Sequence, residues 1–130
     1  MKRLVPAALA LALIPAAALA QSQLLGQEKK ILEMTKNNWV SFRDYNGRQL
    51  IYFTHLEVYR CGISKVRFSL NTDRLDREWR LAECDPSNPH ALPEGYLPYL
   101  SLPLGTARSI VLQLTFIDGT KSTTAHKFAR

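Results

Sequence analysis

Four side chains of this sequence are the plausible candidates for acid–base or metal chemistry, namely His55, Glu57, His90 and His126. His55 and Glu57 are two residues apart, so on an extended strand they would project from the same side, either as metal ligands or as a polar pair. No His-x-x-x-His, Glu-x-x-His, Gly-x-Ser-x-Gly or Gly-x-Gly-x-x-Gly spacing occurs. We therefore expect neither a metal site nor a cofactor.

The first twenty residues have the three parts of a secretory signal peptide. Met1–Arg3 is a short basic start, residues 4–19 are uncharged and rich in Ala and Leu, and Ala18-Leu19-Ala20 places small residues at the cleavage site. The apolar stretch contains two prolines and is shorter than the roughly 20 residues that a spanning helix needs. We therefore expect cleavage after Ala20, a periplasmic or secreted protein, and no transmembrane anchor.

The composition is that of an ordinary globular protein. The chain has 130 residues, of which 46% are hydrophobic and 22% charged, and its formal net charge is +6. These values exclude a disordered acidic tail, a collagen-like repeat and a disulfide-dense scaffold. Residues 21–130 are sufficient for one domain and retain a mild positive charge, which could favour an anionic surface as a partner. Export disfavours nucleic acid as a partner.

Cys61 and Cys84 are the only two cysteines. An even number of cysteines in an exported chain indicates a disulfide bond. The bond would stabilise the fold by about 3 kcal/mol, because it closes a loop in the unfolded chain. The spacing matches neither a zinc site nor a Cys-x-x-Cys redox pair.

An Asn-Gly pair predicts the first hairpin. Asn46-Gly47 separates two apolar, β-rich runs at 39–45 and 48–60, and both turn residues tolerate the positive φ that a type I′ turn requires. We expect Tyr45 to lie opposite Arg48 and Phe42 opposite Ile51. Large apolar side chains then occupy both faces of this sheet, so both faces need to be covered.

The other elements follow from hydrophobic periodicity. Helical spacing predicts a helix over 22–36, and alternation predicts strands at 63–70 and 107–117, the last returning over 120–128 after Asp118-Gly119. Residues 74–83 fit two patterns: Leu75, Trp79 and Ala82 have helical spacing, whereas alternation favours a short turn and then a strand at 78–84. The register of this last hairpin is open, because Phe116 could lie beside either Lys121 or Thr120. We therefore predict an α+β domain, with an antiparallel sheet of about five or six strands, one N-terminal helix packed on it, a long proline-rich covering loop and one disulfide.

The stretch 85–105 contains all five prolines that follow the leader, and also several leucines and two tyrosines. Proline excludes a helix or a central strand there. Two interpretations are open: a long covering loop that lays Leu97, Leu100 and Leu102 on a sheet face, or a stiff platform that presents Tyr96 and Tyr99 to a partner.

The leading functional hypothesis is a small exported, non-catalytic protein-interaction module that binds an envelope or extracellular protein. Its candidate partner-binding residues are Tyr96, Tyr99, Arg74, Arg77 and Arg80. The three arginines would align on one face only if their segment were helical. An inhibitor or accessory subunit of another envelope protein is the alternative, and a small hydrolase or metal-binding protein comes third.

Overall fold

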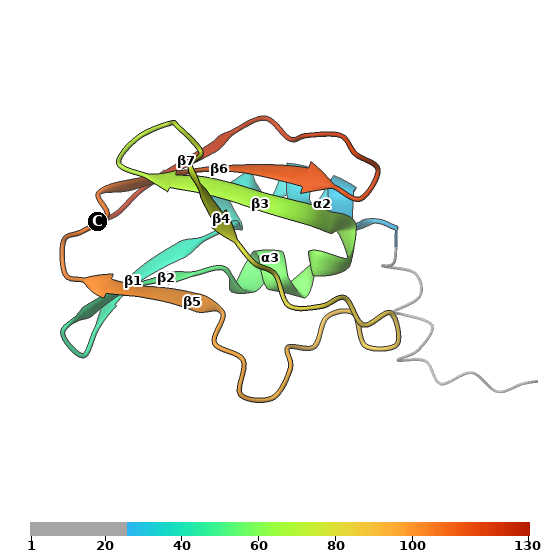
Figure 1. Cartoon of the computed structure of the whole chain (residues 1–130), viewed down its shortest axis with the longest axis horizontal. Helices are drawn as coiled ribbons and strands as arrows, with labels where there is room; N and C mark the ends of the chain where they lie inside the picture. Colours follow the sequence, from blue (N-terminus) through green and yellow to red (C-terminus); the bar gives the residue numbers. More distant parts are fainter. Residues whose placement is uncertain (1–25) are drawn as a thin grey trace, which may run out of the picture.

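Residues 26–130 are described by the computed structural model, which has an α+β fold with two antiparallel sheets (Figure 1). The expected signal peptide, its cleavage site and the start of the predicted N-terminal helix lie outside the described residues. The part of that helix that is described is α2 (Glu28–Met34), and a 3-10 turn, η1 (Lys36–Asn38), follows it. Leu32 of α2 is buried, and its carbonyl accepts a hydrogen bond from the indole of buried Trp39.

The first sheet has the strand order β1-β2-β5. It contains β1 (Ser41–Tyr45), β2 (Arg48–Tyr52) and β5 (Tyr99–Pro103). The predicted register is confirmed, because Tyr45 pairs with Arg48 and Phe42 pairs with Ile51. Asn46 and Gly47 both have positive φ, as their turn type requires. The proline-rich stretch supplies β5, which is an edge strand and so tolerates Pro103 at its end.

The second sheet has the strand order β4-β3-β6-β7. It contains β3 (Ile63–Leu70), β4 (Arg77–Trp79), β6 (Ser109–Phe116) and β7 (Ala125–Phe128). The two sheets form the upper and lower layers of Figure 1. Their buried side chains share one hydrophobic core, to which Ile51 and Phe53 contribute from one side and Val66, Leu112 and Leu114 from the other. The α+β class and the disulfide are thus confirmed, while the strands divide between two sheets.

The second strand of the first hairpin ends at Tyr52, and the prediction that it runs to Arg60 is wrong. The chain turns there into α3 (Thr54–Val58) and η2 (Arg60–Gly62), which lead to the other sheet. Residues 53, 56, 57 and 60 are all buried, and their spacing is that of one helical face. Two of these four residues are charged, so a search for hydrophobic residues at helical spacing does not detect this helix.

The Cys61–Cys84 disulfide joins η2, just before β3, to the segment that follows β4, with the Cα atoms 5.0 Å apart. β4 is shorter than the predicted strand 78–84. Beyond Trp79 the chain leaves β3, and the amide of Ala82 donates to the carboxylate of Glu57 instead of continuing the ladder. The disulfide therefore holds an irregular segment against the corner between the two sheets.

The last hairpin contains both of the registers that the sequence left open. Next to the turn, the amide of Phe116 donates to the carbonyl of Thr120 at 2.8 Å. Farther along, Val111 lies opposite His126, which is the other register. The extra residue between the two regions leaves β7 as a short strand at the free edge of its sheet.

Candidate functional site

Tyr96, a predicted partner-binding residue, is engaged inside the molecule. The carboxylate of Glu57 is fully buried, and its Oε1 accepts hydrogen bonds from the hydroxyl of Tyr96 at 2.8 Å and from the indole of Trp79 at 3.0 Å. The amide of Ala82 donates to the other oxygen at 3.1 Å. Burial, and then the hydrogen bond to Glu57, raise the pKa of Tyr96 well above its usual range. The Tyr96 hydroxyl is therefore a structural donor.

The guanidinium of Arg60 holds the same segment through backbone carbonyls. It is buried and donates to the carbonyls of Glu57 and Glu83 at 2.9 Å each and of Ala91 at 2.8 Å. The carbonyl of Pro89 lies at 3.4 Å. A guanidinium has five donors in a planar fork, so one side chain can satisfy several buried carbonyls of an irregular chain. This contact fixes the first half of the proline-rich stretch.

Of the other predicted binding residues, Arg80 lies next to Tyr96, whose hydroxyl oxygen is 3.3 Å from the carbonyl oxygen of Arg80. Tyr99 is half-buried in β5, where its ring packs against Tyr52 with 5.4 Å between ring centroids. Arg74, Arg77 and Arg80 are exposed, but their segment is not helical and does not align them on one helical face. Arg74 lies in the turn between β3 and β4, at the opposite end of the sheet from α3 (Figure 1).

Two of the candidate titrating residues lie near each other, because His55 and His90 both pack edge-on against the ring of Tyr59, with 5.1 and 5.7 Å between ring centroids. His55 and Glu57 lie on α3, so the prediction that they share one side of a strand is wrong: Glu57 points into the core, and Nε2 of His55 contacts Oγ1 of Thr35 at 2.8 Å. Nδ1 of His90 contacts the carbonyl of Val58 at 3.0 Å, and His126 is exposed on β7. Among residues 26–130, no three His, Cys, Asp or Glu side chains are grouped so that they could hold a metal ion.

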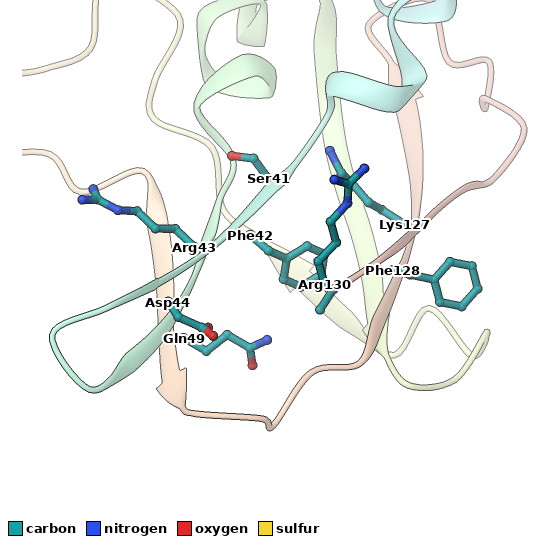
Figure 2. Close-up of a pocket in the computed structure, with 9 residues that line it drawn as sticks. Ser41, Phe42, Arg43, Asp44, Gln49, Lys127, Phe128 and Arg130 are labelled. Atoms are coloured by element: carbon teal, nitrogen blue, oxygen red, sulfur yellow. The ribbon is translucent and has the colours of Figure 1, made fainter.

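A cleft between the two sheets is the site that sequence reasoning missed. It has a volume of about 300 Å³ and lies between β1, an edge strand of one sheet, and β7, an edge strand of the other (Figure 2). Phe42 projects between the two strands in Figure 2, whereas the ring of Phe128 points away from β1. Phe128 is 74% exposed. The residues that line the cleft are Ser41, Phe42, Arg43, Asp44, Gln49, Lys127, Phe128, Ala129 and Arg130.

The cleft has an excess of positive charge. Three of its lining side chains, Arg43, Lys127 and Arg130, are cationic, and Asp44 is the one acid. Within residues 26–130 the one ion pair is Lys29–Asp118, away from the cleft, so these three cations have no carboxylate partner there. The Arg43 guanidinium stacks on the ring of Tyr45 at 4.2 Å, and the Lys127 ammonium is bound to two carbonyls. Arg130 is therefore the lining cation that, within residues 26–130, is most available to an anion in the cleft.

Lys127 closes one end of the cleft. Its side chain crosses from β7 to the start of β1, where Nζ donates to the carbonyls of Val40 at 2.9 Å and Asn37 at 3.0 Å. From this bridge the two strands diverge, so the cleft is open at its other end (Figure 2). The sequence contains the signal for each edge strand, but which two edges face each other is a property of the tertiary structure.

Comparisons with protein-family models, curated proteins and solved structures found no match to this chain. Within residues 26–130, no helix has both the length and the apolar character that crossing a membrane requires.

Proposed function

We propose that this chain is a small exported interaction module that binds an acidic segment of a partner protein in the cleft between β1 and β7. The observation that carries the proposal is the cleft itself, where Lys127 and Arg130 lie beside the apolar ring of Phe42 and have no carboxylate partner within residues 26–130. Arg43 adds a third positive charge on the outer face of β1. Apolar contact together with unpaired charge gives an interface both affinity and selectivity.

Two features support export. The first twenty residues have the pattern of a secretory signal peptide, and the Cys61–Cys84 disulfide is of the kind that persists in oxidising compartments. Export also limits the partners to proteins of the envelope or the extracellular space.

The proline-rich stretch is less suited to be the main binding surface. Arg60 binds its carbonyls at Pro89 and Ala91, and Glu57 binds the hydroxyl of Tyr96 that a partner would otherwise use. Its leucines at 100 and 102 pack against the core. Leu97 is the exception, since it is 61% exposed. An inhibitor or accessory subunit that inserts Leu97 into another protein is therefore the second candidate function.

Three charge or polarity variants distinguish these surfaces when the protein is used to capture its partner from the exported fraction of the native host. Arg43→Glu with Arg130→Glu reverses the charge of the cleft, and Arg74→Glu with Arg77→Glu makes the same change on the predicted arginine surface. Leu97→Asp changes the exposed loop. We expect the cleft variant alone to lose the partner that the wild type recovers.

Loss of the partner in a variant other than the cleft variant would overturn the proposal, and the variant affected would identify the binding surface. Loss of the partner only in the Arg74 and Arg77 variant would assign binding to the predicted arginine surface. Loss only in Leu97→Asp would favour the inhibitor or accessory subunit. Circular dichroism of each variant checks that the fold is intact.

A further inference from the structure

We infer that the partner segment binds as an added β-strand, which pairs its backbone with the free edge of β1. This inference rests on the proposed function and specifies the chemistry of the partner: an extended polypeptide that alternates acidic and small apolar side chains. Strand addition derives affinity from main-chain hydrogen bonds and selectivity from alternate side chains.

The hydrogen bonds of the first sheet determine which backbone groups of β1 point into the cleft. The amide of Phe53 donates to the carbonyl of Pro98 at 2.7 Å, one step beyond the end of the β2–β5 pairing. In an antiparallel sheet the backbone groups of alternate residues point to opposite neighbours. Ile51 and Gln49 therefore bond to β5, and the residues between them bond to β1.

The same alternation extends to β1. Ser41, Arg43 and Tyr45 face β2, because they pair with Tyr52, Leu50 and Arg48. The amide and carbonyl groups of Phe42 and Asp44 consequently point away from β2. Val40 is next in this series, and its carbonyl accepts from Lys127 across the cleft, as the alternation requires. Within residues 26–130, Phe42 and Asp44 thus offer two unpaired amides and two unpaired carbonyls.

β7 presents a second edge to the same cleft. The amide of Ala129 donates to the carbonyl of Arg108 at 2.9 Å and so continues the pairing of β7 with β6. Alternation leaves the backbone groups of His126 and Phe128 on the side away from β6. A strand inserted beside β1 would therefore lie between two edges and bridge the two sheets.

The remaining sheet edges are less open to strand addition. On β5, Pro103 has no amide hydrogen, and the guanidinium of Arg48 donates to the carbonyl of Ser101 at 3.1 Å. On the other sheet, β4 is only three residues long. Proline, charged side chains and short length are the features that protect an edge from pairing with another chain. The edge of β1 lacks a proline, and this contrast favours β1 as the acceptor.

The side chains that flank β1 determine the pattern of the segment. Phe42 shares the inner face with buried Ile51, its partner in β2, whereas Arg43 lies on the outer face. A segment with an apolar residue against Phe42 and acidic residues on the face of Arg43 would match both faces. A lysine-rich segment would meet like charges on the same side.

A seven-residue peptide of alternating glutamate and valine, acetylated and amidated, is the probe, and its valine–lysine counterpart is the control. Asp44→Pro removes one amide that points into the cleft and leaves the ladder to β2 complete, because a proline is tolerated at such an edge position. Asp44→Ala removes the same carboxylate and keeps the amide. We expect Asp44→Ala to bind the glutamate peptide at least as tightly as wild type and Asp44→Pro to weaken it about tenfold relative to Asp44→Ala.

Amide exchange measured by NMR on the wild type gives a second readout that needs no variant. Peptide binding should slow the exchange of the Phe42 and Asp44 amides, while the Arg43 amide is already paired with β2. Each of three results would overturn strand addition. The two Asp44 variants could bind the peptide equally, the amides of Phe42 and Asp44 could exchange at an unchanged rate, or the glutamate peptide could fail to bind at millimolar concentration. If the cleft variant also retains the native partner, the proposed function fails as well. If the cleft variant (Arg43→Glu with Arg130→Glu) loses the native partner but the peptide experiments fail, only strand addition is overturned and the proposed function stands.

Discussion

Glu57 and Arg60, three residues apart on one buried helical face, bind the same irregular segment in complementary ways. The carboxylate of Glu57 accepts from Trp79, Ala82 and Tyr96, whereas the guanidinium of Arg60 donates to backbone carbonyls that include that of Glu57 itself, at 2.9 Å. One residue satisfies donors and the other satisfies acceptors. Together they replace the backbone ladder that residues 80–96 lack.

Glu57→Gln should destabilise the fold by about 3 kcal/mol, because the amide nitrogen of Gln cannot accept from the buried donors that now converge on the carboxylate. Urea denaturation monitored by circular dichroism measures this change. Glu78→Gln on exposed β4 is the matched control and should alter the free energy of unfolding by less than about 0.5 kcal/mol. Similar values for the two variants would contradict a structural role for the Glu57 carboxylate.

Arg60→Met should cost about 3 kcal/mol, since it leaves several buried carbonyls without a donor while nearly preserving the volume of the side chain. Arg67→Met, at an exposed position of β3, makes the same chemical change as a control. Limited proteolysis should also cut the segment 83–91 faster in Arg60→Met than in the control. Unchanged cleavage there would mean that the guanidinium does not hold this segment.

Removal of the disulfide by Cys61→Ala with Cys84→Ala should lower the free energy of unfolding by about 3 kcal/mol. The bond ties the corner at η2 to the irregular chain after β4, so its loss should also increase amide exchange in that chain. An unfolding midpoint equal to that of the wild type would show that Glu57 and Arg60 alone hold the segment.

His55 should make the fold less stable in mild acid. Burial disfavours the imidazolium form and lowers the pKa of His55 from its ordinary value of 6.5. The unfolded chain therefore takes up this proton first, so the contribution of His55 to stability is complete above that ordinary pKa and is lost as the pH falls through it toward the lower folded-state value.

Thermal unfolding of wild type and His55→Gln between about pH 7.5 and 5.5 tests this linkage. Gln can still bond to Thr35 but does not titrate, so the variant should lose less thermal stability than the wild type over this range. His90 and His126 are present in both proteins, and the difference between the two curves isolates His55. An equal or larger loss in the variant would contradict the linkage.

The parts of the fold that the sequence predicts well are those that depend on local chemistry. Asn46-Gly47 determines its own turn, and the register of Phe42 against Ile51 follows from it. The helix α3 escaped prediction because Glu57 and Arg60 look like surface residues until their partners, from 22 to 39 residues away, are in place. The cleft could not be predicted at all, since it depends on how β1 and β7 face each other.

Site-specific photocrosslinking in the native host tests the central proposal most directly. A benzoylphenylalanine is placed at Ser41 on the rim of the cleft, at Arg74 in the β3–β4 turn, or at Leu97 in the proline-rich loop. Binding in the cleft predicts a partner adduct from position 41 and none from position 74 or 97. An adduct from position 74 or 97, with none from position 41, would contradict it.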